Sequence, residues 1–281
     1  MIPAGFDYAA PDSIDEAIQL LGQAGDEAKL LAGGHSLLPL MKLRFAAPSM
    51  LIDLRKLDDL KGIQSGNGDG TRIGALTTHA MLQESDLGLP AAAAKQIADQ
   101  QVRNRGTIGG SLAHGDPASD LPAVLLAMDG SVTARGPNGE RTIAASDLFQ
   151  DYLTTSLGDD EVITDVRLPS MDGYGHAYVK FARRAEDWAM VGVAALVKVE
   201  DGSFSDVRVG LTHMGTTPLR ATQVEQALNG QPVDEGRIQA AAESAAEGTD
   251  PPADLNATPD YKRHLARIVV ARAVIQAAAG G

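Results

Sequence analysis

The chain has 281 residues and no cysteine, and 37 acidic residues against 24 Lys and Arg give it a net charge of −13. A length of this order is typical of about two domains. The acidic balance argues against a nucleic-acid interface, because phosphate contacts need clustered Lys and Arg. The lack of cysteine excludes disulfides, thiolate zinc sites, catalytic thiols and cysteine-ligated iron–sulfur clusters.

The N-terminal part of the sequence predicts a small α/β unit. Ser13 followed by Glu16 has the spacing of a capping box, and apolar residues at helical intervals predict a helix over 14–21 that ends at Gly22 or Gly25. Short apolar runs at 29–32 and 50–54 predict strands, and residues 37–43 form a helix-like stretch between them. Alternating helices and strands of this kind favour an α/β arrangement.

The next block mixes hairpins and short helices. Strands are predicted over 60–64, 71–76, 131–134, 141–144 and 161–168, with turns at 65–70 and 136–139. Thr78 is placed to cap a helix that runs towards Glu84, and residues 90–99 suit another helix.

The composition shifts near residue 175, where we expect a domain boundary. Three strands, over 176–181, 191–199 and 204–211, precede three helices. We expect the first helix to be capped by Thr217 with Pro218 at its first position, the second to cover 234–247, and the third to run from the Thr258 cap to Ala279. Strands followed by helices predict an α+β fold.

Membrane and export signals are not recognisable in the sequence. The first seven residues have neither the basic nor the apolar region of a secretory signal. The longest apolar run, 121–128, contains Pro122 and falls far short of the ~20 residues of a spanning helix. We therefore expect a cytoplasmic protein without a transmembrane segment.

Two glycine-centred segments, 32–36 (AGGHS) and 107–111 (TIGGS), are the strongest candidates for a binding site. Each contains a Gly pair and ends in a hydroxyl residue before an apolar stretch. Paired glycines allow positive φ, so that successive N–H groups can surround an anion such as a diphosphate, and a following helix adds its positive end. The alternative interpretation is that each pair is a simple turn.

Other nucleotide and catalytic motifs are missing from the sequence. It contains no G-x-G-x-x-G after a strand, no P-loop and no G-x-S-x-G elbow. The six His residues are scattered without an H-E-x-x-H pattern, so no metal site is predicted.

Four further side chains have a functional and a structural interpretation. Asp116 and Asp120 are candidates for an acid–base pair or for polar contacts to a ligand, but a turn residue and an N-cap are the simpler alternatives. Lys180 lies between the apolar residues Val179 and Phe181, so its side chain points to the face of the predicted strand opposite to theirs. Trp188, the single Trp, is either a core anchor or a platform that stacks on a flat cofactor.

Taken in order, these segments resemble a known family. Residues 32–42 (AGGHSLLPLMK), 50–54 (MLIDL), 107–111, 116–123 (DPASDLPA) and 178–188 resemble the flavoprotein, or medium, subunits of molybdenum-containing hydroxylases, and the carbon monoxide dehydrogenase type most of all. The resemblance covers nearly the whole chain. It implies a two-part FAD-binding domain, 1–57 and 58–175, followed by a C-terminal α+β domain, 176–281, with a three-stranded antiparallel sheet and helices.

The resemblance also implies which residues bind FAD. They are Ala32, Gly33, Gly34, His35, Ser36, Thr107, Ile108, Gly109, Gly110, Ser111, Asp120, Ile163, Lys180 and Trp188. In this family the two Gly segments surround the diphosphate, while Lys180 and Trp188 lie near the flavin. Ser111 stands where Asn is common, and Trp188 where relatives can have Tyr.

The electron route in this family implies the partners. Electrons pass from a molybdenum centre through two [2Fe–2S] clusters to non-covalent FAD, and then to NAD, a quinone or oxygen. Because this chain has no cysteine, the clusters must belong to an iron–sulfur small subunit and the molybdopterin to a large subunit, in a dimer of heterotrimers. No catalytic side chain is expected here. The substrate is oxidised on another chain. Carbon monoxide is the first candidate for this substrate, and aldehydes or N-heterocycles are the alternatives.

Two other functions remain open at this point. One is a stand-alone flavin oxidase in which His35 bonds FAD covalently. The other is a flavin-free interaction protein whose Gly pairs are only turns.

Overall fold

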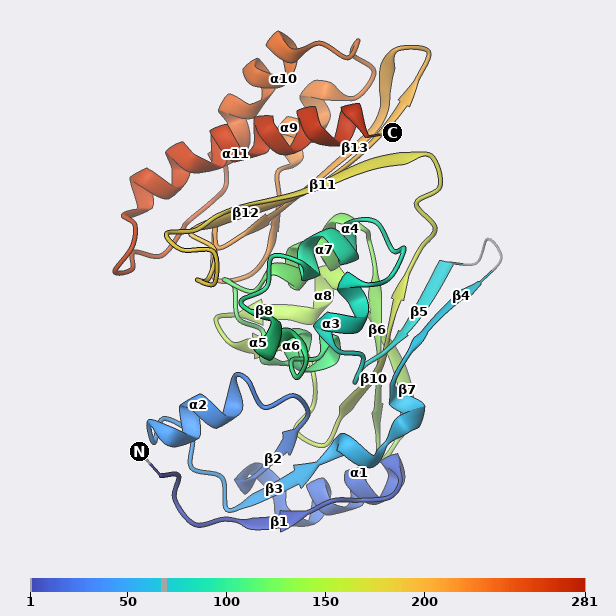
Figure 1. Cartoon of the computed structure of the whole chain (residues 1–281), viewed down its shortest axis with the longest axis vertical. Helices are drawn as coiled ribbons and strands as arrows, with labels where there is room; N and C mark the ends of the chain where they lie inside the picture. The colour runs from blue at the N-terminus through green and yellow to red at the C-terminus, as the bar shows by residue number, and fades with distance from the viewer. Residues whose placement is uncertain (1, 67–69, 281) are drawn as a thin grey trace.

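The computed structural model describes residues 2–66 and 70–280 and begins with a small three-stranded parallel sheet of order β1-β3-β2 (Figure 1). Its elements are β1 (Asp7–Ala9), α1 (Ile14–Ala24), β2 (Ala28–Leu31), α2 (Leu37–Lys42) and β3 (Met50–Asp53). The predicted cap is confirmed, since the Ser13 hydroxyl accepts from the Glu16 N–H, and Gly25 ends α1. The predicted α/β unit is therefore correct, with β1 as an additional strand.

The middle of the chain is built on a five-stranded antiparallel sheet of order β4-β5-β10-β6-β7. Its strands are β4 (Ile63–Gly66), β5 (Gly70–Gly74), β6 (Ser131–Gly136), β7 (Gly139–Ala144) and β10 (Val162–Leu168), and β8 (Phe149–Asp151) pairs separately with β9 (Thr154–Thr155). The helices are α3 (His79–Gln83), α4 (Leu89–Ala94), α5 (Gln100–Arg103), α6 (Ile108–His114), α7 (Asp120–Ala127) and α8 (Ala145–Leu148). Both predicted hairpins are present, although residues 67–69 of the first predicted turn lie outside the described residues.

The C-terminal sheet has four strands rather than the expected three. They are β11 (Tyr174–Phe181), β12 (Val191–Glu200), β13 (Ser203–Thr212) and the short β14 (Leu219–Arg220). The helix expected at Thr217 begins instead at Thr222, because Leu219 and Arg220 pair with the edge of β13. This tertiary pairing overrides the local helix signal of Pro218.

Three helices follow the C-terminal sheet. They are α9 (Thr222–Leu228), α10 (Glu235–Ala242) and α11 (Pro259–Ala279), and the last begins at the predicted Thr258 cap. Although α11 is 21 residues long, no helix in the described part of the chain combines the length and the hydropathy needed to cross a bilayer.

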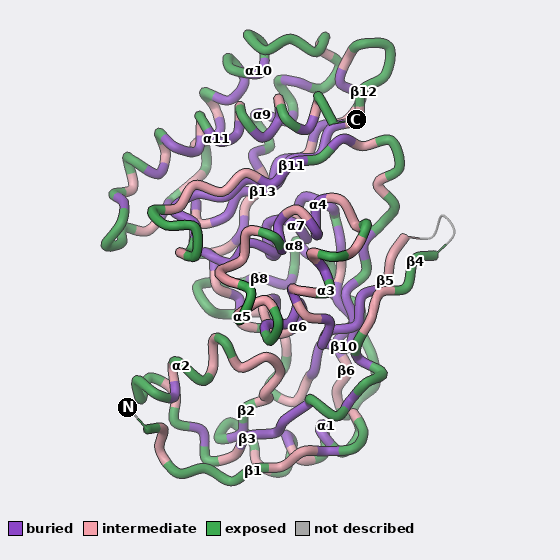
Figure 2. The backbone as a smooth tube through the Cα atoms, viewed as in Figure 1, coloured by how far each residue is buried: buried purple, intermediate pink, exposed green. Residues whose placement is uncertain are grey.

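The C-terminal sheet is buried on both faces. Residues 191–197 of β12 are all buried, which matches their uninterrupted apolar sequence (Figure 2). Val193 and Val197 pack in the core beneath α9, α10 and α11, whereas Ala194 and Leu196 pack with α4 and α7 of the middle region. One sheet therefore supplies core residues to both halves of the chain.

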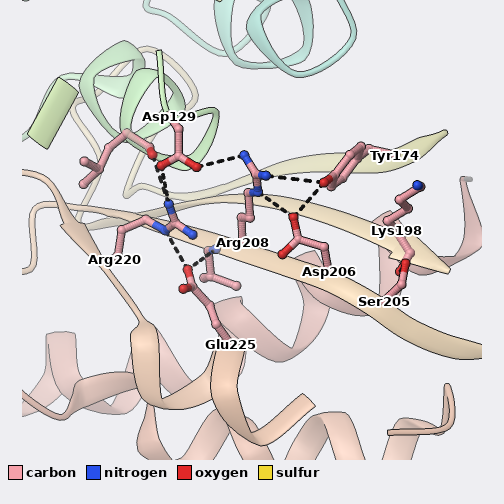
Figure 3. Close-up of polar contacts among 10 residues, drawn as sticks. Asp129, Tyr174, Lys198, Ser205, Asp206, Arg208, Arg220 and Glu225 are labelled. Carbon is pink, nitrogen blue, oxygen red and sulfur yellow. Dashed lines mark hydrogen bonds and ion pairs between the residues drawn. The ribbon is translucent and has the colours of Figure 1, made fainter. Parts of the chain in front are cut away.

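A polar network adds a second connection between the halves (Figure 3). The Asp129 carboxylate, just beyond α7, accepts from Arg208 on β13 and Arg220 on β14, at 2.9 Å in each case. Arg220 also bonds Glu225, whose carboxylate accepts the Val209 N–H at 2.7 Å. These charge-assisted bonds fix the end of α7 against the sheet edge.

Candidate functional site

In the ribbon, α2 and β2 of the N-terminal region face α5 and α6 of the middle region (Figure 1). Residues from both regions line a cleft of about 740 Å³. All but one of the residues predicted from the sequence line it, namely Ala32, Gly33, Gly34, His35, Ser36, Thr107, Gly109, Gly110, Ser111, Asp120, Ile163, Lys180 and Trp188. The exception is Ile108, whose side chain is buried in the core of the middle region.

The two glycine segments meet at one side of this cleft. A Cβ on Gly33 would lie 2.2 Å from the carbonyl oxygen of Arg105 and 2.8 Å from the Cα of Gly106. A Cβ on Gly110 would lie 3.6 Å from the Cβ of Ala32. Segments more than 70 residues apart in sequence are thus in backbone contact, and only glycine fits at position 33.

The first segment presents unpaired backbone N–H groups. Gly34 has φ of +78°, and the chain turns from there into α2. Within the described residues, the N–H groups of Gly33, Gly34, His35 and Ser36 have no hydrogen-bond acceptor. Consecutive free N–H groups on one turn form a site that favours an anion. The turn therefore offers free N–H donors in a segment that lines the cleft.

The second segment differs from the prediction. Gly109 and Gly110 lie inside the first turn of α6 and not before it. The N–H of Ile108 donates to Thr77 O at 3.0 Å, that of Gly109 to Ala75 O at 2.8 Å, and that of Gly110 to the Thr107 hydroxyl at 3.2 Å. These N–H groups are already paired within the protein, in contrast to those of residues 33–36, and the segment forms a wall of the cleft.

Close packing explains the glycine at position 109. A Cβ there would lie 2.5 Å from the Cβ of Ala75. Beyond the Gly pair, the Ser111 hydroxyl lies 2.7 Å from the Ser119 hydroxyl, and the two share a hydrogen bond. The start of α6 is therefore fixed by contacts to the middle region.

Asp120 is part of a buried ion pair. It lies in the first turn of α7, after the N-cap Ser119, and its carboxylate accepts from Tyr178 at 2.6 Å and from Lys180 at 3.0 Å. Lys180 also donates to the Gln96 carbonyl at 3.1 Å. Burial raises the pKa of Asp120, although Lys180 and Tyr178 oppose the shift. The N-cap alternative is wrong, and Asp120 and Lys180 are partners.

Asp116 is a turn residue, as its simpler interpretation predicted. Its carboxylate accepts from the Ala118 N–H at 2.8 Å, which is the pattern of an Asx turn. Asp116 also lines the cleft, but its bonding gives no acid–base pair with Asp120.

Two further predicted residues, Trp188 and Ile163, line the cleft. Trp188 lies in the exposed loop between β11 and β12 and keeps 57% of its surface accessible, so it is not a core anchor. Ile163 is buried at an irregularity of β10, where the pairing with β6 shifts register. An exposed indole and a buried strand residue thus border the same cavity.

Two further parts of the site carry no recognisable motif in the sequence. His79 lines the cleft, and burial lowers its pKa to about 4, with the nearby His35 and Arg103 adding to the shift. Its Nδ1 is buried and has no partner within the described residues. Residues 153–155 and 157–159 also line the cleft, from β9 and its flanking loops. These positions reach the cleft only through tertiary packing.

Replacement of Lys180 by Met should lower the free energy of unfolding by about 3–5 kcal/mol at neutral pH, because the Asp120 carboxylate is then buried without its cation. The folded-state pKa of Asp120 is already raised by burial, and loss of Lys180 raises it further. The stability of this variant should therefore fall as the pH rises through that pKa and recover towards acid. Urea denaturation from mildly acidic to neutral pH measures this effect.

The matched control is Asp120→Asn combined with Lys180→Met. It removes the unpaired charge and keeps an acceptor for the Tyr178 hydroxyl, so most of the stability should return. Wild-type stability of the single variant at neutral pH would contradict the assignment of the pair.

The chain matches two known family models in tandem. Residues 4–171 match the FAD binding domain in molybdopterin dehydrogenase, and residues 176–277 match the CO dehydrogenase flavoprotein C-terminal domain. The carbon monoxide dehydrogenase medium chain of Hydrogenophaga pseudoflava is 43% identical over 98% of this chain and 97% of its own length. The nicotine 6-hydroxylase medium subunit of Paenarthrobacter nicotinovorans is 40% identical over 97% of each chain.

Solved structures agree with these matches. A chain of the carbon monoxide dehydrogenase from Hydrogenophaga pseudoflava superposes with a TM-score of 0.96 at 46% identity over 99% of both chains. A chain of quinoline 2-oxidoreductase from Pseudomonas putida 86 superposes with a TM-score of 0.95 at 32% identity, over 100% of this chain and 99% of that one. The resemblance inferred from the motifs is confirmed, and the chain belongs to the family of FAD-binding medium subunits of molybdenum-containing oxidoreductases.

Proposed function

We propose that this chain holds FAD non-covalently in the cleft and acts as the electron-relay subunit of a molybdenum hydroxylase. The observation that carries the proposal is the contact of Gly33 with residues 105–106, directly before the second glycine segment, which brings the free N–H groups of residues 33–36 to the wall formed by α6. A flavin-free interaction protein would need neither feature.

The first segment fits the diphosphate of FAD. Its N–H groups are neutral donors, so a chain with a net charge of −13 can bind an anion there without a cluster of Lys and Arg. Burial lowers the pKa of His35, and the positive charge of Arg105 lowers it further, against a smaller effect of Asp99. The charge of Arg105 therefore acts at this turn and adds to the attraction for a diphosphate.

We assign the flavin ring to the part of the cleft bordered by Ile163, Lys180 and Trp188. FAD accepts and releases electrons one or two at a time, which is the chemistry that a relay between clusters and a terminal acceptor requires. Trp188 offers a flat face for stacking. Asp120 and Lys180 form an ion pair with each other, so we propose that they stabilise the structure of the site. We propose no acid, base or nucleophile in this chain.

The proposed complex contains an iron–sulfur small subunit and a molybdopterin large subunit, arranged as a dimer of heterotrimers in the cytoplasm. The zero cysteine count supports separate cluster-bearing chains. The names "medium chain" and "medium subunit" of the relatives support an assembly with other subunits. We propose that the chain divides into 1–57, 58–175 and 176–281, supported by the connection 169–173 between β10 and β11, which lies just before the last boundary.

For the substrate of the complex we propose carbon monoxide. The support is the 43% identity to the carbon monoxide dehydrogenase medium chain over nearly the whole chain. The nicotine 6-hydroxylase medium subunit, at 40%, favours an N-heterocycle as the second candidate.

Replacement of Gly33 by Ala should give folded protein with little or no FAD, because a Cβ cannot coexist with the Arg105 carbonyl unless the two segments separate. Gly110→Val should act similarly by placing bulk towards Ala32. The flavin-to-protein ratio, measured by absorbance after desalting, tests both variants. The control is Gly22→Ala in α1, where nothing lies near the added Cβ, and it should keep full flavin. Stoichiometric FAD in both glycine variants would contradict the site.

Acid precipitation should release all the yellow colour into the supernatant, because we propose that backbone hydrogen bonds bind FAD and that His35 forms no covalent bond to it. His35→Asn should likewise retain flavin before acid treatment. Flavin that remains with the pellet of the wild-type protein, but not with that of His35→Asn, would establish the covalent oxidase instead.

Purification of the chain from its native host should yield two further chains, one of them rich in cysteine and bound to iron. The complex should reduce an artificial electron acceptor when given carbon monoxide, with nicotine as the comparison substrate. The chain expressed alone should hold FAD but no iron, because it has no cysteine. A solitary chain that oxidises substrate with full activity would refute the relay function.

A further inference from the structure

His213 follows directly after β13 and contacts two different segments. Its backbone N–H donates to the carbonyl of Pro117 at 2.9 Å, and its ring Nδ1 lies 2.6 Å from the carbonyl oxygen of Ala189. The residue has φ of +64°, a conformation in which His, Asn and Asp are the most common non-glycine residues. His213 therefore bonds one segment through its backbone and the other through its side chain.

The bond to Ala189 fixes the tautomer of the ring. A carbonyl oxygen only accepts, so Nδ1 must carry the proton and donate it. Burial lowers the pKa of His213, which keeps the ring neutral at neutral pH and leaves Nε2 without a proton. The Nζ of Lys262 lies 3.2 Å from Nε2 and can donate to it.

Lys262 is anchored in turn. Its side chain from α11 is fully buried, and its ammonium group has three donors. Besides His213 they reach the Pro252 carbonyl at 2.8 Å and the Asp254 carboxylate at 2.7 Å. That carboxylate also accepts from the N–H groups of Asn256 and Ala257. The ring of His213 therefore rests on a fully bonded cluster that is rigid by its packing.

The two carbonyls that His213 holds belong to segments that form the cleft. Pro117 lies in the segment that carries Asp116 and Asp120 to the cleft, and Ala189 immediately follows Trp188. Residues 183–186 and Trp188 are exposed, whereas Ala189 is buried. His213, Lys262 and Asp254 themselves do not line the cleft. The cluster thus lies behind the site and reaches it through two backbone carbonyls.

We propose that His213 is a positioning residue that holds the Trp188 loop and the segment before α7 in place on one side of the cleft, and that Lys262 supports its ring. The flavin part of this inference rests on the function proposed above. The part that concerns the loop does not need bound FAD.

The single Trp makes the inference measurable, because Trp188 lies next to the bonded carbonyl. The experiment records fluorescence anisotropy of Trp188, excited at the red edge of its absorption, in full-length protein with and without FAD. His213→Leu keeps most of the volume and removes the ring donor, so the Trp188 anisotropy should fall in both forms. FAD binding should weaken about fivefold, because the released loop must then be ordered on binding at a cost comparable to one hydrogen bond.

Two control variants separate positioning from stability. His213→Asn places an amide donor near the position of Nδ1 and tolerates the positive φ, so it should restore anisotropy and FAD affinity towards wild type. Leu228→Ala, in the core beneath the C-terminal sheet, should lower the melting temperature without changing the anisotropy. If His213→Leu does not fold, His213→Ala takes its place.

Wild-type anisotropy in the Leu variant, an equal fall in Leu228→Ala, or a fall in His213→Asn as large as in the Leu variant would each overturn the inference. If the wild-type protein binds no FAD, the proposed function fails, while the anisotropy of the flavin-free variants still decides the positioning role.

Discussion

The site depends on the approach of two backbones at Gly33. The turn after β2 lies so close to residues 105–106 that a Cβ has no room, and this contact closes one side of the cleft. The two segments have different tasks. The N–H groups at the start of α6 are bonded inside the middle region and make a fixed wall, whereas those of residues 33–36 are free to bind an anion. A rigid wall beside an unpaired turn is a preorganised binding site, because little has to be ordered when a ligand arrives.

Much of this arrangement could be predicted from local signals. Ser13 and Thr258 predicted the starts of α1 and α11. A hydroxyl that can cap the first turn, followed by apolar residues at helical spacing, indicates a helix start without reference to the rest of the chain. The apolar run over 191–199 predicted the strand that the structure shows as β12. The order of the motifs then predicted a set of site residues, nearly all of which line the cleft.

The remaining features depend on partners distant in sequence. Nothing local to Gly109 shows that its N–H bonds the carbonyl of Ala75, so its helical conformation was missed. The pairing of Asp120 with Lys180 joins residues 60 positions apart, and β14 exists only because the edge of β13 is available to it. Spacing along the chain identified these residues, but it could not show which of their polar atoms would form hydrogen bonds with other parts of the protein.

The sheet that both halves share has a consequence for how this protein can be handled. Ala194 and Leu196 face α4 and α7, so a chain cut near residue 175 would leave one apolar face of the C-terminal sheet uncovered and strip the helices of their covering. The ion pairs of Asp129 would be severed by the same cut. Truncated fragments would therefore tend to aggregate during expression, because each would expose apolar surface that the intact chain buries.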